Sequence, residues 1–122
     1  ANWGYEESKH SMVMQEWLIK SGHRTEEQIE EVQSWAVIGE WELPTDDVRG
    51  LACYTMAQEL ATWLHYRNLR LLIGETDPAL AKLLTLVATD ERAHYDFYVK
   101  ILRLHLADDR AGTIEQLRRV LH

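Results

Sequence analysis

Residues 84–98 read LTLVATDERAHYDFY, and this stretch decides the fold because it sets a glutamate and a histidine within an apolar helical pattern. Glu91 and His94 are three positions apart, so they project from the same face of an α-helix with 3.6 residues per turn. Their neighbours on that face are mostly apolar: Leu84, Val87, Ala88, Tyr95 and Tyr98. We therefore expect Glu91 to point into the interior, where a carboxylate needs a cation or a proton.

A second pair of the same kind lies near the beginning of the sequence. Glu7 and His10 are also three positions apart, and Trp3, Met14 and Leu18 share their helical face. One such pair alone is more often a pair of solvated surface residues. Two pairs on two helices, however, match the way in which a four-helix bundle holds two metal ions.

Glu59 is a third carboxylate that we expect to point inward. Its helical neighbours are mostly apolar or aromatic: Thr55, Met56, Thr62, Trp63 and Tyr66. Mixed carboxylate and imidazole ligands suit iron or manganese better than calcium. The sequence has one cysteine, Cys53, which we expect to be a small core residue rather than a zinc ligand.

Helical spacing of apolar residues recurs along the whole sequence, and the alternation typical of strands is absent, which predicts an all-α fold. Gly22 and Gly74 each end a predicted helix, and Pro78 occupies a first turn, where its missing N–H is tolerated. We predict five helices, over residues 3–21, 25–39, 47–73, 76–106 and 113–121.

Caps and turns divide these predicted helices. The predicted N-terminal caps are Thr25 with Gln28, Thr45 or Asp46, and Thr113 with Gln116. We expect a turn at Asp108, Asp109 and Gly112, and a buried stripe on the second helix formed by Ile29, Val32, Ala36 and Trp35.

Composition restricts the class of protein. The 122 residues are 46% hydrophobic and 27% charged, which is typical of one folded domain over residues 1–122. The net charge of −7 argues against a nucleic-acid partner, and no stretch approaches the roughly 20 apolar residues of a membrane span. A single cysteine fits a reducing compartment, for which we expect the cytoplasm, with the plastid stroma as the alternative.

Three segments resemble motifs of the soluble acyl-acyl-carrier-protein desaturases of the stearoyl type. YEESKHS at residues 5–11 resembles the EENRHG motif of that family. YTMAQELAT at residues 54–62 resembles its YTSFQERAT, and DERAH at residues 90–94 resembles its DEKRH. The order and rough spacing agree, and the resemblance extends over nearly the whole chain.

The resemblance implies a ferritin-like helical bundle, usually a homodimer, with a non-haem di-iron centre. In that family O₂ and two electrons, typically from ferredoxin, introduce a cis double bond into a long acyl chain carried by acyl carrier protein or CoA. The iron ligands implied here are Glu7, His10, Glu59, Glu91 and His94, with Glu7 and Glu91 bridging. Asp90 would hydrogen-bond a ligating imidazole, and Thr62 would lie beside the metals, where oxygen is activated.

The family has a sixth ligand, a glutamate on a helix that precedes the first motif, and this sequence begins after that position. We therefore expect a C-terminal portion of a longer bundle. Two alternatives stay open. The chain could belong to another ferritin-like di-iron oxygenase or oxidase, such as a hydroxylase or N-oxygenase, with manganese possible in place of iron. It could also be a non-catalytic helical interaction module that is stable only with a partner chain.

Overall fold

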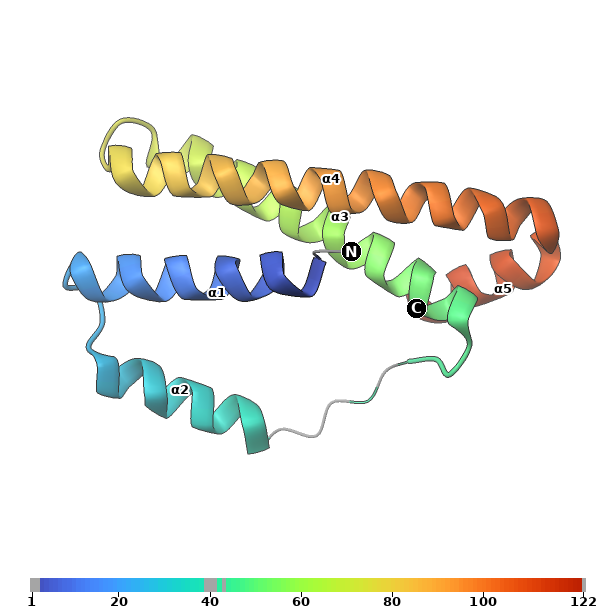
Figure 1. The fold of residues 1–122 in the computed structure, drawn as a ribbon, viewed down its shortest axis with the longest axis horizontal. Helices are drawn as coiled ribbons and strands as arrows, with labels where there is room; N and C mark the ends of the chain where they lie inside the picture. Colours follow the sequence, from blue (N-terminus) through green and yellow to red (C-terminus); the bar gives the residue numbers. More distant parts are fainter. Residues whose placement is uncertain (1–2, 39–41, 43, 122) are drawn as a thin grey trace. The chain divides into compact units, whose positions relative to one another are not determined.

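The structure is a computed structural model that describes residues 3–38, 42 and 44–121. In this part of the chain there are helices and no strands (Figure 1). The helices are α1 Trp3–Lys20, α2 Glu26–Ile38, α3 Val48–Ile73, α4 Pro78–Asp108 and α5 Arg110–Leu121. The predicted all-α fold of the helical-bundle type is therefore confirmed, and none of the described helices is both long and apolar enough to cross a membrane.

The chain divides into two compact units, Ala1–Glu42 and Leu43–His122. In the first unit, Gly22 follows α1 with φ +76°, and its N–H donates to the carbonyl oxygen of Ile19 at 3.0 Å. The predicted capping box opens α2: Thr25 N–H donates to Gln28 Oε1 at 3.0 Å, and Gln28 N–H donates to Thr25 Oγ1 at 3.3 Å. Local sequence signals thus determine where α1 ends and where α2 begins.

The predicted buried stripe of α2 is wrong. Val32 and Trp35 are 68% and 69% exposed, Ala36 is exposed, and Ile29 is half-buried. Within the described residues of this unit, α1 is the one helix besides α2, and a single neighbouring helix covers too little of an apolar stripe to bury it. Gly39, the predicted end of this helix, lies outside the described residues.

The second unit is a helical hairpin with a fifth helix packed on it. The long helices α3 and α4 run in opposite directions and are joined by a short turn, and α5 contacts both (Figure 1). Gly74, with φ +56°, follows α3, and Pro78 begins α4 as predicted. Cys53, Leu84 and Val87 are at most 2% exposed and form the centre of the core. Cys53 is therefore the core residue that the sequence predicts, and burial raises the pKa of its thiol.

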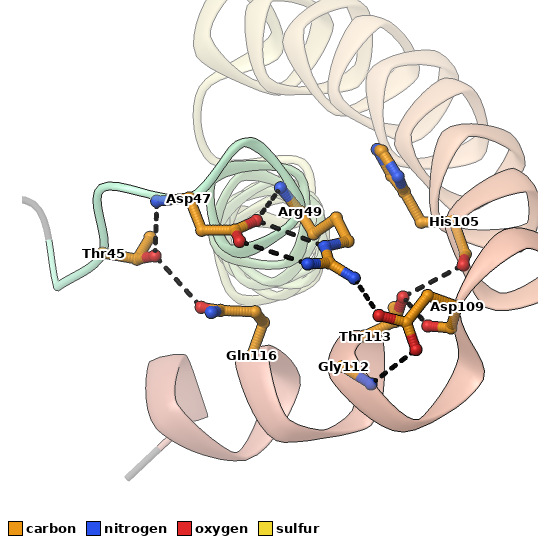
Figure 2. A network of polar contacts seen from close by, with 8 residues as sticks. All are labelled: Thr45, Asp47, Arg49, His105, Asp109, Gly112, Thr113 and Gln116. Carbon is orange, nitrogen blue, oxygen red and sulfur yellow. Dashed lines mark hydrogen bonds and ion pairs between the residues drawn. The ribbon is translucent and has the colours of Figure 1, made fainter.

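A polar network connects the start of α3 to α5 and to Asp109, which lies between α4 and α5 (Figure 2). Arg49 forms ion pairs with Asp109 and with Asp47. Thr45 Oγ1 accepts the N–H of Asp47 at 3.1 Å and donates to Gln116 Oε1 at 3.1 Å. The hydrogen bond that Arg49 donates to the carboxylate of Asp109 raises the pKa of Arg49. The network joins segments about 60 to 70 positions apart in sequence.

Two predicted caps are corrected by this network. Asp47, not Thr45 or Asp46, caps α3, because its Oδ1 accepts the Arg49 N–H at 2.7 Å and the same bond lowers its pKa. The carboxylate of Asp109 accepts the N–H of Gly112 at 3.0 Å and then the guanidinium of Arg49, and both bonds lower its pKa.

Because Asp109 caps the next helix directly, α5 begins at Arg110 and Gly112 lies inside it rather than in a turn. The predicted capping box of Thr113 with Gln116 is therefore wrong. Thr113 is fully buried, and its hydroxyl donates backwards to the carbonyl oxygens of Asp109 at 2.6 Å and His105 at 3.1 Å.

Candidate metal centre

The hairpin of α3 and α4 brings together three of the predicted ligands. Glu59 on α3 and Glu91 on α4 are each 3% exposed, and His94 on α4 is 7% exposed. Leu84 and Val87 precede Glu91 on the same face of α4 and are buried with it, as the sequence pattern predicts. Each of the three polar residues offers one ligand atom, and these atoms lie within 4.8 Å of one another.

Hydrogen bonds and close contacts cross between the two helices at this point. His94 Nδ1 lies 3.4 Å from Glu59 Oε2. The hydroxyl of Thr62, on α3, donates to Glu91 Oε2, on α4, at 2.9 Å. The same hydroxyl lies 3.1 Å from the carbonyl oxygens of both Gln58 and Glu59. Thr62, which the family resemblance places beside the metals, therefore contacts a predicted ligand directly.

The charge and donor chemistry of this cluster fit a cation of the expected kind. Glu59 and Glu91 carry two negative charges when both are ionised, and His94 can offset one of them. Burying such a set is unfavourable unless a positive charge balances it. Two carboxylates and one imidazole suit iron or manganese, and ligand atoms around one or two such ions are separated by distances of this size.

The other predicted site residues take defined positions in their own helices. Glu7 and His10 share one face of α1, in the first unit, where Glu7 is half-buried and His10 is 6% exposed. Trp3, expected on the same buried face, is 42% exposed, because it stands in the first turn of α1. Asp90 is half-buried and directly precedes Glu91 in α4.

A second cross-helix cluster lies beside the first, and the sequence did not predict it. The guanidinium of Arg92 lies 4.4 Å from the ring centroid of Trp63 and 5.7 Å from that of Tyr95. Arg92 Nε also pairs with Asp96 Oδ2 at 3.1 Å. The available signal was the spacing of Arg92, Tyr95 and Asp96, which at i, i+3 and i+4 share one face of α4.

Comparisons with known proteins agree on one family. The sequence model of the family described as fatty acid desaturase matches residues 1–122. Stearoyl-[acyl-carrier-protein] 9-desaturase 5, chloroplastic, of Arabidopsis thaliana is 32% identical over 114 residues, and the chloroplastic stearoyl-[acyl-carrier-protein] 9-desaturase of Linum usitatissimum is 30% identical over 114 residues. Palmitoyl-[acyl-carrier-protein] 4-desaturase 2, chloroplastic, of Ophrys arachnitiformis subsp. archipelagi is 29% identical over 105 residues.

These alignments cover most of this chain but only part of each relative. The first two cover 92% of this chain and 29% of the relative, and the third covers 83% and 27%. The chain thus spans less than a third of the length of the curated relatives that it matches. No solved structure gives a significant match.

Proposed function

Because this chain belongs to the fatty acid desaturase family, we propose that it supplies metal-binding helices of an acyl-[acyl-carrier-protein] desaturase. The observation that carries the proposal is the buried cluster of Glu59, Glu91 and His94, whose ligand atoms lie within 4.8 Å of one another. The relatives named above act on stearoyl or palmitoyl groups carried by acyl carrier protein. An acyl thioester of that kind is the substrate that we propose for this chain.

The proposed cofactor is a pair of iron ions, with manganese as the alternative metal. The proposed ligands are Glu59, Glu91 and His94 together with Glu7 and His10 of α1. When bound, the iron would supply the O₂-dependent oxidation that removes two hydrogens from the acyl chain. The first three ligands rest on the geometry of α3 and α4. Glu7 and His10 rest on the repeated glutamate–histidine spacing and on the resemblance of their motif.

The remaining side chains would control protons and ligand orientation. The hydroxyl of Thr62 donates a hydrogen bond to the carboxylate of Glu91 at 2.9 Å, so it can orient that carboxylate. We propose that Asp90 accepts a hydrogen bond from a ligating imidazole, which would fix the ring and its tautomer. We propose that Leu84 and Val87, which are buried on the same face of α4 as Glu91, help to keep water away from the cluster.

The proposed partners follow the family. They are acyl carrier protein as the carrier of the substrate, a ferredoxin-type electron donor, and a second copy of the complete protein in a homodimer. The relatives are chloroplastic by name, which favours the plastid stroma over the cytoplasm as the location.

Anaerobic Fe(II) titration followed by Mössbauer spectroscopy tests the metal centre. We expect two irons per intact bundle, and fewer irons for Glu59→Gln, which removes a negative charge without changing the side-chain shape. Glu115→Gln, at an exposed glutamate of α5, is the matched control and should bind as wild type does. Fewer than two irons per intact bundle contradicts the di-iron proposal, and a protein that stays folded and monomeric without any iron favours a helical interaction module.

Product analysis then separates the two oxidative functions. With a stearoyl-acyl-carrier-protein substrate, O₂ and a ferredoxin reducing system, we expect an unsaturated acyl chain. A hydroxylated product would instead assign the chain to another class of di-iron oxygenase.

A further inference from the structure

Arg92 joins α3 and α4 on the flank of the candidate metal centre. Its guanidinium lies over the ring of Trp63, at 4.4 Å, and within 5.7 Å of the Tyr95 centroid. The two rings are stacked on each other at 6.3 Å with an interplanar angle of 22°. The ion pair with Asp96, one turn further along α4, restricts the directions that the guanidinium can take.

Each member of this stack directly follows a residue of the centre. Trp63 follows Thr62 on α3, and on α4 Arg92 follows Glu91 and Tyr95 follows His94. Consecutive residues of an α-helix project about 100° apart, so the stack and the centre occupy adjacent faces of the same two helices. The Trp63–Arg92 contact and the Thr62–Glu91 hydrogen bond therefore cross the same helix pair, one residue apart on each helix.

Rotation of either helix affects both contacts at once. With side chains reaching about 5 to 6 Å from the helix axis, a rotation of about 10° displaces their ends by about 1 Å. The bond from Thr62 to Glu91 is 2.9 Å long, and a hydrogen bond lengthened by about 1 Å is lost. A contact that holds the rotation of α4 against α3 therefore also holds the Glu91 carboxylate at Thr62.

We infer that Arg92 is a positioning residue for the metal centre, which it serves by locking the rotation of α4 against α3 through Trp63 and Tyr95. A cation over aromatic faces suits this role, because the attraction is directional and persists at a half-exposed position. The expected effect on metal affinity rests on the proposed function. The effect on the side chain of Thr62 can be measured in the metal-free protein and does not rest on it.

The test compares Arg92→Gln, which removes the cation, with Arg92→Lys, which keeps one that can lie over Trp63. Arg103→Gln removes an exposed arginine from the same helix and is the matched control. NMR of the threonine methyl groups in the metal-free chain reports the side-chain conformation of Thr62, whose signal is assigned with Thr62→Val. Anaerobic Co(II) titration of the same proteins reports metal affinity.

We expect Arg92→Gln to shift the Thr62 methyl signal and to weaken Co(II) binding by about 10-fold, the lower end of the range for groups that support ligands. Arg92→Lys should restore part of both properties, and Arg103→Gln should change neither. Thermal unfolding of each variant separates this effect from a loss of folding.

An unchanged Thr62 signal in Arg92→Gln overturns the inference whatever the metal affinity. An equal loss of affinity in Arg92→Gln and Arg103→Gln also overturns it, because that result reports net charge rather than position. If the wild-type chain binds no Co(II), the proposed metal centre fails, while the Thr62 signal still decides the role of Arg92.

Discussion

Replacing Thr62 by valine should destabilise the metal-free protein, although threonine and valine have nearly the same shape and helix propensity. The substitution removes the hydroxyl that donates from α3 to Glu91 Oε2 on α4 at 2.9 Å. Glu91 is 3% exposed, so water does not readily replace the lost donor. The folded state then keeps a buried carboxylate with one hydrogen bond fewer.

The structure sets the size of this effect. A hydrogen bond to a charged group contributes about 1.5–3 kcal/mol to stability. The hydroxyl of Thr62 has one proton, and the carbonyl oxygens of Gln58 and Glu59, both at 3.1 Å, compete for it. Thr62 is also only half-buried. Both factors reduce the contribution, so we expect a loss of about 1–1.5 kcal/mol, which lowers the Tm of a 122-residue domain by about 4–6 °C.

Urea unfolding followed by circular dichroism measures the loss, with Thr62→Ser and Thr89→Val as controls. Thr62→Ser keeps the hydroxyl and should retain most of the stability. In Thr89→Val the lost hydroxyl donates to the carbonyl oxygen of Thr85 at 2.8 Å on the exposed side of α4, so we expect a change within about 0.5 kcal/mol. Equal stabilities of Thr62→Val and Thr89→Val would refute the reasoning, since the bond to the carboxylate would then contribute nothing.

Three further outcomes are expected. Gly50→Ala should lower the free energy of unfolding, measured in urea, by about 1–2 kcal/mol. The new Cβ would lie 2.7 Å from both Gln116 Oε1 and Thr45 Cβ, and this overpacking outweighs the better helix propensity of alanine. A more stable variant would contradict this expectation. Asp109→Asn should lower the Tm at neutral pH, and the difference from wild type should disappear in acid. The lowered pKa of Asp109 gives stability that is present above the ordinary pKa of 3.8 and is lost as the pH falls through the pKa of the folded state. Asp108→Asn, at an exposed residue, is the control, and a Tm difference that does not depend on pH would contradict the assignment. Fe(II) at about 100 times its Kd should stabilise the chain by about 2.7 kcal/mol, reversibly by chelation, in anaerobic thermal scans; an unchanged Tm would argue against a site formed in the folded state.

Local signals explain why the end of α1 and the start of α4 were predictable, whereas the start of α5 was not. Gly22 and Pro78 act through their own backbone conformations, so they terminate or begin a helix whatever surrounds them. Asp109 reads as a turn residue in the sequence, but it closes α4 and caps α5 at the same position. The contact from Arg49, 60 positions earlier, supports that arrangement, and no local pattern contains it.

Helical periodicity also made the inward-facing residues of the candidate site predictable, whereas their contacts across the two helices depend in addition on the register of α3 against α4. Periodicity decides which residues of a helix face inward, which identifies Glu59, Glu91 and His94. It does not decide which of them face one another, because that depends on how far α3 and α4 slide along each other. The inward faces of the two helices therefore follow from the sequence pattern, whereas their register does not.

The short turn between the helices supplies the missing register. Glu59 stands about four helical turns before the end of α3 at Ile73, and His94 stands about four turns after the start of α4 at Pro78. Thr62 and Glu91 are each about one helical turn closer to the same connection than Glu59 and His94 are. The same register of α3 against α4 therefore places both pairs opposite each other. Two antiparallel helices rise equally per residue, so residues equally far from a tight turn must lie side by side. The connection from α3 to α4 therefore positions the cluster of Glu59, Glu91 and His94 from about 20 Å away, and its length determines how these side chains meet as much as their own places in the helices do.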